Sequence, residues 1–292
     1  MPRCAFLTLA DPTGFFIYDH LAIPPLEALG WSVETLPWTA EDVDWGNFDA
    51  VVIRSTWDYQ LRPDAFLSRL AEIERAGARV LNPIETCRWN LEKTYLRELE
   101  ARGVTIIPSL WPDHLDPAVL LESFDHFRTE RLVAKPLVGA NADGISIICR
   151  YQPDTWPLAT FSGQPLIVQP FIESIEGEGE HSLFYFDSEY SHAIVKTPKA
   201  GDFRVQEEHG GLIRAVHPED DLLAAGARTL DAIDERLLYA RVDLVRLPDG
   251  SPAVIEVELI EPSLYFPYDP ESPARFARAL DRMMKDPSTG QQ

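Results

Sequence analysis

The pattern of apolar segments changes at Asn82-Pro83, and this change constrains the fold more than any other feature of the chain. Before it, strand-like runs alternate with helix-like stretches, at residues 3–10, 21–29, 48–53, 66–76 and 79–81. Alternation with short connections is typical of an open, mostly parallel sheet. We therefore expect an N-terminal βαβ domain over residues 1–82. Ligands of such sheets bind beyond the carboxyl ends of the strands.

After Pro83 the alternation gives way to pairs of strand-like runs joined by short loops. Three pairs are expected: 132–136 with 145–149, 181–186 with 190–196, and 239–247 with 253–259. Two further strands are expected, an edge strand at 104–108 and a strand at 166–169. Loops this short connect antiparallel strands. Helix-like stretches are expected at 92–101, 118–127, 220–236 and 273–285. The sequence thus predicts a mixed α/β chain, with a parallel sheet first and antiparallel sheets after it.

A glycine-containing loop at 137–144 lies between two of these strands. Backbone N–H groups in such a loop can hold phosphate, and Lys135 precedes it directly. P-loops and Rossmann motifs place a helix after their glycines, so a strand at 145–149 argues against both. The alternative is that Gly139 and Gly144 only shape a turn.

Acidic residues alternate with apolar residues in the run Val254 to Glu261. Because strand side chains point to opposite faces in turn, Glu256 and Glu258 share one face. A hairpin through Asp249-Gly250 brings Asp243 beside Glu256. Three carboxylates on one face suit a hard cation such as Mg²⁺, which prefers oxygen ligands and keeps waters or substrate phosphates. The alternative is a solvated acidic face, since 47 residues are acidic.

Lysines are scarce among the 26 basic residues of the chain; they are Lys93, Lys135, Lys196, Lys199 and Lys285. A compact ammonium binds phosphate as a point charge, whereas arginine binds it as a planar fork. Lys196 and Arg204 beside a metal would suit a polyphosphate. An ordinary basic loop is the alternative.

The net charge of −21 argues against nucleic acid and anionic membranes as partners. No run reaches the ~20 apolar residues of a membrane span, and no secretory signal is present. The three cysteines are odd in number and widely spaced, which argues against a disulfide framework or a structural zinc site. Free cysteines of this kind favour a location in the cytoplasm.

The order and spacing of these elements resemble the ATP-grasp superfamily, in particular its glutathione-synthetase-like carboxylate–amine ligases. Over the whole chain the resemblance is to ligases of the O-ureido-serine cyclo-ligase type. The segments that carry it are Arg54 to Tyr59, Asn82-Pro83, Gly201 to Arg204, Arg241 to Asp243, and Glu256 to Ser263. It implies an ATP-grasp domain over 83–292, with a nucleotide-binding subdomain at about 105–170 and a catalytic subdomain at about 171–285.

The resemblance also implies roles for individual residues. Nucleotide contacts are expected from Lys93, Lys135, Gly139, Asn141, Gly144, Gln169, Phe171, Ile172 and Glu180, the last at the ribose hydroxyls. Mg²⁺, with Mn²⁺ as an alternative ion, is expected on Asp243, Glu256 and Glu258. Among the expected catalytic residues, Lys196 and Arg204 would contact the γ-phosphate and the transferred phosphoryl group, and Arg241 would face the phosphorylated intermediate. Many relatives have Asn where this chain has Glu258, which leaves the number of metal ions open. Pro170 lacks an N–H, so the donor to adenine is expected from Phe171 or Ile172.

The function implied is ATP-dependent, ADP-forming ligation: a carboxylate-like oxygen is phosphorylated and an amine then attacks, with intramolecular cyclisation as one form. A small-molecule kinase and a nucleotide-binding regulatory protein without turnover remain alternatives. We expect the loop at 137–144 and the segment at 199–211 to be mobile lids without nucleotide. The sequence is compatible with a homo-oligomer.

An amino-acid-like substrate is expected near the 54–59 loop, where Arg54 would bind its carboxylate and Asp58 its amine. Trp57 and Ser263 complete the expected substrate contacts. Packing of this loop at the domain interface is the alternative.

Overall fold

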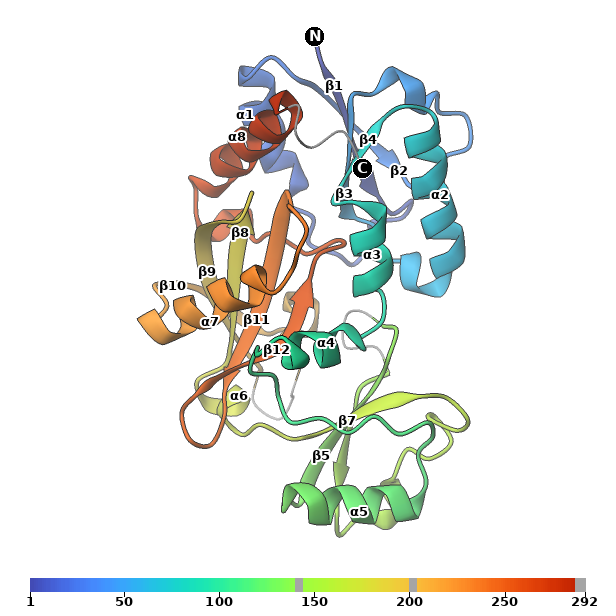
Figure 1. The fold of residues 1–292 in the computed structure, drawn as a ribbon, viewed down its shortest axis with the longest axis vertical. Coiled ribbons are helices and arrows are strands. Elements are labelled where there is room, and N and C mark those ends of the chain that lie inside the picture. Colours follow the sequence, from blue (N-terminus) through green and yellow to red (C-terminus); the bar gives the residue numbers. More distant parts are fainter. Residues whose placement is uncertain (140–143, 200–203, 287–292) are drawn as a thin grey trace.

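The computed structural model describes residues 1–139, 144–199 and 204–286 (Figure 1). The expected fold class is confirmed: a parallel sheet at the N-terminus precedes two antiparallel sheets. No described helix is both long and apolar enough to cross a bilayer.

The N-terminal sheet has four parallel strands in the order β2-β1-β3-β4. They are β1 (Arg3–Thr8), β2 (Ser32–Pro37), β3 (Ala50–Ser55) and β4 (Arg79–Leu81). β3 is buried along its whole length because it has a strand on each side and helices on both faces. β2 was not expected from the sequence, since this edge strand is only half-buried and lacks an apolar run.

Helices from both ends of the chain cover this sheet. On one face, β1 residues Ala5 and Leu7 pack in the core of α2 (Pro63–Arg75). On the other, Cys4 and Phe6 share a core with α1 (Ile23–Ala28) and α8 (Ser272–Lys285). Figure 1 shows α8, the last helix of the chain, beside α1 at the N-terminal sheet. The closing helix therefore completes the N-terminal layer.

The central sheet has five antiparallel strands in the order β10-β9-β8-β11-β12. They are β8 (Glu180–Phe186), β9 (Glu189–Thr197), β10 (Leu212–Val216), β11 (Tyr239–Arg246) and β12 (Pro252–Glu258), with α7 (Asp220–Asp231) beside β11 and β12. The short β10, at one edge and largely exposed, was not expected.

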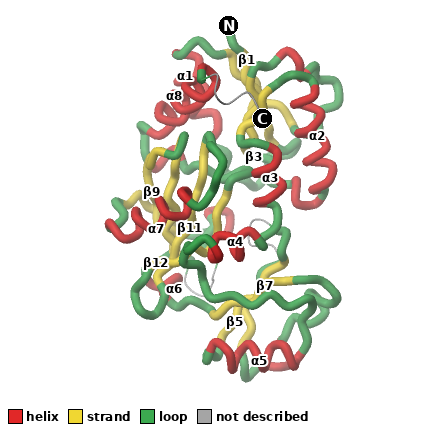
Figure 2. Tube along the Cα trace, in the orientation of Figure 1, coloured by secondary structure: helices red, strands yellow, loops and turns green. Residues whose placement is uncertain are grey.

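A three-stranded antiparallel sheet forms the far end of the molecule (Figure 2). Its strands are β5 (Arg131–Pro136), β6 (Ser146–Cys149) and β7 (Leu166–Pro170), in the order β6-β5-β7. Helix α5 (Pro117–Phe127) packs Leu120 and Phe124 against the sheet. The strands β5 and β6 flank the glycine loop, which confirms a strand, not a helix, after it.

Helices α3 (Ile84–Asn90), α4 (Tyr95–Ala101) and the short α6 (Ser174–Gly177) connect the sheets. The edge strand expected at 104–108 is wrong: only Ile106 forms a single parallel bridge, to Val254 of β12. Pro108, which has no N–H to donate, limits further pairing. The helix expected at 92–101 is α4, which begins only at Tyr95. The helix expected at 220–236 is α7, which ends at Asp231.

Candidate active site

One cavity lies between the central sheet and the three-stranded sheet, and most of the expected site residues line it. Those that do are Trp57, Lys93, Lys135, Gly139, Gln169, Phe171, Ile172, Glu180, Lys196, Arg204, Arg241, Asp243, Glu256, Glu258 and Ser263. They come from segments far apart in the sequence, so the fold gathers them. Arg54, Asp58 and Gly144 are not among the lining residues.

The acidic residues of the β11–β12 hairpin meet as the strand pattern predicts. Asp243 and Glu256 are direct cross-strand partners, and Arg241 is opposite Glu258. The strands shift register between Asp243 and Leu244, beside this pair. The hairpin therefore presents Asp243, Glu256 and Glu258 toward one cavity.

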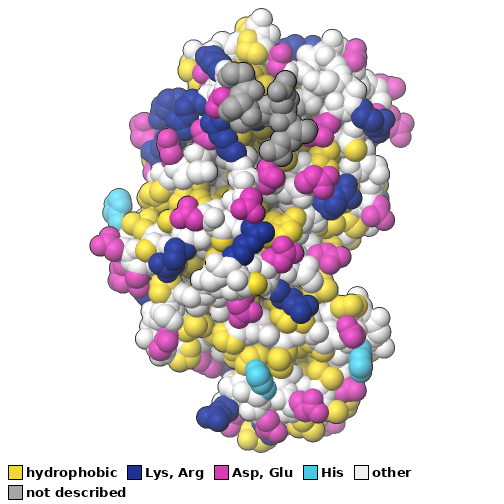
Figure 3. Space-filling view, in the orientation of Figure 1, with side chains coloured by type: hydrophobic (Ala, Val, Ile, Leu, Met, Phe, Trp, Pro, Cys, Tyr) yellow, Lys and Arg dark blue, Asp and Glu magenta, His cyan; other side chains and the backbone are white. Residues whose placement is uncertain are grey.

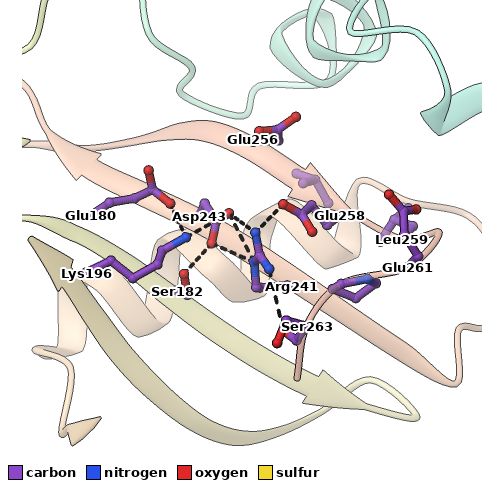
Figure 4. Close-up of polar contacts among 12 residues, drawn as sticks. Glu180, Ser182, Lys196, Arg241, Asp243, Glu256, Glu258, Leu259, Glu261 and Ser263 are labelled. Carbon is purple, nitrogen blue, oxygen red and sulfur yellow. Dashed lines mark hydrogen bonds and ion pairs between the residues drawn. The ribbon is translucent and has the colours of Figure 1, made fainter. Parts of the chain in front are cut away.

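Arg241 joins two of these carboxylates (Figure 4). Its Nε lies 3.1 Å from both Asp243 carboxylate oxygens, and its Nη2 lies 2.9 Å from Oδ2. The same Nη2 donates to Glu258. Burial alone would lower the pKa of Arg241, but Asp243 and Glu258 raise it well above its usual value, so the guanidinium stays charged.

Lys196 contacts two other acidic groups from the central sheet. It pairs with Glu180, its cross-strand partner, and its Nζ lies 3.6 Å from Asp243 Oδ2. Burial alone would lower the pKa of Lys196, but Asp243 and Glu180 outweigh it and raise the pKa. Glu180, expected at the ribose, is thus already held by an ammonium. A ribose would share this carboxylate with Lys196.

Lys93 and Lys135 face the hairpin from the other side of the cavity. The Nζ of Lys93 lies 2.9 Å from Glu256 and donates to the Gly139 carbonyl at 3.0 Å. Burial lowers the pKa of Lys135. Among the described residues, no carboxylate lies within ion-pair distance of its ammonium group. Burial also favours a protonated Glu256, but Lys93 and Lys135 hold its pKa below the usual range.

Burial has a larger effect on Glu258. It raises the pKa of this carboxyl to about 7, although the nearby Arg241 lowers it. In Asp243, Arg241 and Lys196 outweigh burial and keep the pKa below its usual range. A bound cation favours the ionised form of a carboxyl, so it would lower the pKa of Glu258.

The donors fit a hard divalent ion only in part. Carboxylate oxygens suit Mg²⁺. Yet within the described ranges no three acidic, histidine or cysteine side chains lie close enough to hold a metal by themselves. Each of the three carboxylates expected to hold the ion is paired with Lys93, Lys196 or Arg241. An ion here needs phosphate oxygens as further ligands.

The segment after β7 was expected to bind adenine through its backbone. Phe171 N–H already donates to the Arg131 carbonyl at 3.0 Å. The side chain of Gln169 donates to Ser109 at 2.9 Å. Among the described residues, no acceptor is found for the N–H of Ile172. Of the two donors expected, Ile172 is the one the structure leaves available.

Arg54 has a different place from the one expected. It is 1% exposed, and its Nε lies 3.1 Å from Asp19 while its Nη2 donates to the Pro262 carbonyl at 2.8 Å. Its guanidinium also lies 5.0 Å from the centre of the Tyr239 ring. The expectation that Arg54 contacts substrate is therefore corrected: it packs at the junction between the N-terminal sheet and the residues after β12.

Asp58 is also turned away from the cavity. It accepts a hydrogen bond from Trp38 Nε1 at 2.7 Å and pairs with Arg62 at 3.9 Å. By contrast, Trp57 lines the cavity and donates from Nε1 to the Glu261 carbonyl at 2.9 Å. Of the three substrate contacts expected from this loop, Trp57 lines the cavity, and Arg54 and Asp58 do not.

Parts of the two expected lids, including Asn141, lie outside the described residues, so their expected mobility stays a prediction. Gly144 has φ +71°, and a Cβ there would lie 3.2 Å from Pro136. Glycine is thus needed at the end of the loop.

Tyr59, on the loop expected to face the substrate, lines the cavity, and so do Glu261 and Tyr265, for which the sequence predicted no role. Glu261 ends the acidic run that carried the metal prediction, and its position beyond the strand concealed its role. Burial and, secondarily, Glu258 raise its pKa to about 8.

Comparison with known proteins agrees with this architecture. A family model described as the N-terminal domain of D-cycloserine synthetase DcsG matches residues 4–82. The cycloserine biosynthesis protein DcsG of Streptomyces lavendulae is 34% identical over 287 residues, which cover 91% of this chain and 95% of that protein. The crystal structure of D-cycloserine synthetase DcsG superposes with a TM-score of 0.84 at 32% identity, over 97% of this chain and 100% of that one.

The fold is shared more widely. The ATP-grasp ligase PsnB, solved with a minimal precursor, Mg and ADP, has a TM-score of 0.66 at 17% identity, over 97% of both chains. This likeness shows the fold alone, whereas the likeness to DcsG extends to sequence over almost the whole chain. The expected resemblance is confirmed: the chain has the fold of the ATP-grasp ligase PsnB, and it belongs to the family of cycloserine biosynthesis protein DcsG.

Proposed function

We propose that the protein is an ATP-dependent, ADP-forming ligase that makes a C–N bond on a small amino-acid-like substrate. One observation carries the proposal: the ammonium groups of Lys93, Lys135 and Lys196 and the guanidinium of Arg241 surround Asp243 and Glu256 in a single cavity. Such an arrangement suits the triphosphate of ATP with its Mg²⁺. The PsnB structure with Mg and ADP supports this choice of ligands.

In the proposed reaction, a substrate carboxylate oxygen bonds to the γ-phosphorus and the bond from that phosphorus to the ADP oxygen breaks. An amine nitrogen then bonds to the acyl carbon, phosphate leaves, and the amine proton passes to water. Such phosphoryl transfer asks mainly for positioning and charge neutralisation. Lys135, Lys196, Arg204 and Arg241 would supply positive charge to the phosphoryl oxygens.

Asp243, Glu256 and Glu258 would hold Mg²⁺, or Mn²⁺ in its place, and the ion would neutralise charge on the phosphates. For this, Lys93 and Arg241 must exchange their carboxylate partners for phosphate oxygens. Ile172 N–H would donate to adenine, in a cavity that Ile107 and Val133 also line.

We propose that the substrate is an amino acid derivative and that its amine can be within the same molecule, so that the product is cyclised. The name of the relative, D-cycloserine synthetase, supports a cyclic product. The enzyme would act in the cytoplasm, where ATP is available, and assembly into a homo-oligomer is left for measurement.

An ADP-release screen tests the proposal. Amino acids and their ureido and dipeptide derivatives, O-ureido-serine first, are offered with ATP and Mg²⁺, and products are identified by mass. Release that requires an amine and gives a dehydrated product supports the ligase. A stable phosphorylated product from one acceptor would identify a kinase instead. Binding of ATP without release in any mixture would identify a regulatory nucleotide-binding protein.

A further inference from the structure

Glu261 differs from the other buried or half-buried carboxylates that line the cavity. Glu180, Asp243, Glu256 and Glu258 each form an ion pair with a lysine or arginine. Among the described residues, no basic group lies within ion-pair distance of Glu261, although it is only 8% exposed. A buried carboxylate without a cationic partner is costly unless something supplies the positive charge.

The contacts that Glu261 does make hold it in place. The hydroxyl of Tyr59, a residue that is 6% exposed, lies near enough to its carboxyl to lower the pKa. Its carbonyl accepts one from Trp57 Nε1 at 2.9 Å. In Figure 4 its carboxylate points away from the group of ion pairs around Arg241. The side chain is thus separate from the expected metal ligands and still lines the same cavity.

The surroundings of Glu261 suit an organic cation. Trp57, Tyr59 and Tyr265 also line the cavity, and aromatic rings attract ammonium groups. The ionised form of Glu261 would repel a phosphate and attract an ammonium group. Arg241, which is expected to face the phosphorylated intermediate, lies near enough to Glu261 to lower the pKa of its carboxyl, although the two form no ion pair in the described structure. The phosphorylated carboxyl and a charge bound by Glu261 would therefore lie in the same part of the cavity.

We propose that Glu261 binds the α-ammonium group of the substrate, so that this enzyme selects α-amino acids over simple carboxylic acids. The proposal rests on the proposed ligase function and names the group by which its substrate is recognised. An α-amino acid carries its ammonium on the carbon next to the carboxyl, and Glu261 is a buried carboxylate of the cavity lining with no ion-pair partner among the described residues. Tyr59 would orient the carboxylate of Glu261.

The test is a comparison of two variants with two substrates. The substrates are O-ureido-serine, or whichever amino acid gives the fastest ADP release, and the same molecule with hydrogen in place of the α-amino group. The variants are Glu261→Gln, which keeps the size and the acceptor for Tyr59, and Glu122→Gln, which removes a charge from an exposed site on α5. ADP release gives kcat and KM for each pair.

We expect Glu261→Gln to lower kcat/KM for the amino acid about tenfold to a hundredfold, mainly through KM. The desamino compound should change less than about threefold, because it lacks the group that Glu261 binds. Glu122→Gln should leave both substrates unchanged. Equal losses for both substrates, or no loss for either, would overturn the proposal.

A second variant covers the case in which Glu261→Gln folds poorly. Glu261→Asp keeps the charge but shortens the side chain, and we expect a smaller loss confined to the amino acid. If the wild-type protein releases ADP equally well with the amino and desamino substrates, the proposal fails while the ligase function stands. If no substrate releases ADP from the wild-type protein, the ligase function itself fails.

Discussion

Lys93 and Glu256 face each other across the cavity, with the lysine Nζ 2.9 Å from the carboxylate Oε1. Lys93 precedes α4, whereas Glu256 lies in β12, so the contact joins segments 163 positions apart. The same ammonium donates to the Gly139 carbonyl of the glycine loop. This lysine therefore links the loop expected to cover the phosphates with the strand expected to hold the metal.

Replacing Glu256 by Gln should abolish Mg²⁺-dependent ADP release while the fold survives. The amide is neutral and cannot offset the charge of a divalent ion or of Lys93. Turnover is measured over a range of Mg²⁺ concentrations, and folding by circular dichroism, with Glu122→Gln as the control for loss of an acidic group. Full activity in Glu256→Gln would remove this residue from the metal assignment.

Mg²⁺ should bind poorly without nucleotide. In the structure the carboxylates are paired with Lys93, Lys196 and Arg241, so an ion arriving alone must displace these cations. With ADP present, the phosphates can take over the cations and add oxygen ligands. We expect the ion to bind at least about tenfold tighter with ADP, as measured by titration calorimetry. Equal affinity with and without ADP would contradict this exchange of partners.

Replacing Arg54 by Ala should destabilise the fold rather than weaken substrate binding. Its guanidinium is buried, and its loss leaves the Asp19 carboxylate, 9% exposed, without its ion pair. Breaking a buried pair in this way costs about 3–5 kcal/mol. Chemical denaturation measures the loss.

The control for Arg54 is Arg88→Ala, which breaks an exposed pair with Glu85 and should cost less than about 1 kcal/mol. A large rise in KM at unchanged stability would return Arg54 to the substrate site.

The stability of the ligand-free protein should depend on pH through Glu261. Burial raises the pKa of this carboxyl to about 8 in the folded protein, from 4.5 when unfolded. The folded state therefore binds the proton more tightly, and its contribution to stability is present below about pH 4.5 and is lost as the pH rises through about 8.

Denaturation of the wild-type protein and of Glu261→Gln between pH 5 and 8.5 checks this. The variant carries no titrating group at this position, so its stability should fall less steeply with rising pH. The Glu122→Gln control should follow the wild type. Identical slopes in wild type and Glu261→Gln would show that position 261 does not titrate as described.

Local sequence patterns were enough for the elements that carry the chemistry. The alternation in Val254 to Glu261 and the turn at Asp249-Gly250 predicted that Asp243 would meet Glu256, and the register confirms it. The same patterns overlooked β2 and β10, because an edge strand buries little and needs no strong apolar signal. Arg54 was misplaced for a related reason: a charged residue after a strand looks the same whether it meets substrate or packs beneath it.

The sequence by itself determined which segments become strands with acidic or basic side chains, because side-chain direction in a hairpin follows from spacing alone. Only the tertiary structure decided which charges pair. Lys93 reaches Glu256, α8 closes the N-terminal sheet, and Glu261 has no ion-pair partner within the described ranges, since each depends on contacts between distant segments. Such contacts are set by how whole layers pack, and no short stretch of sequence encodes them.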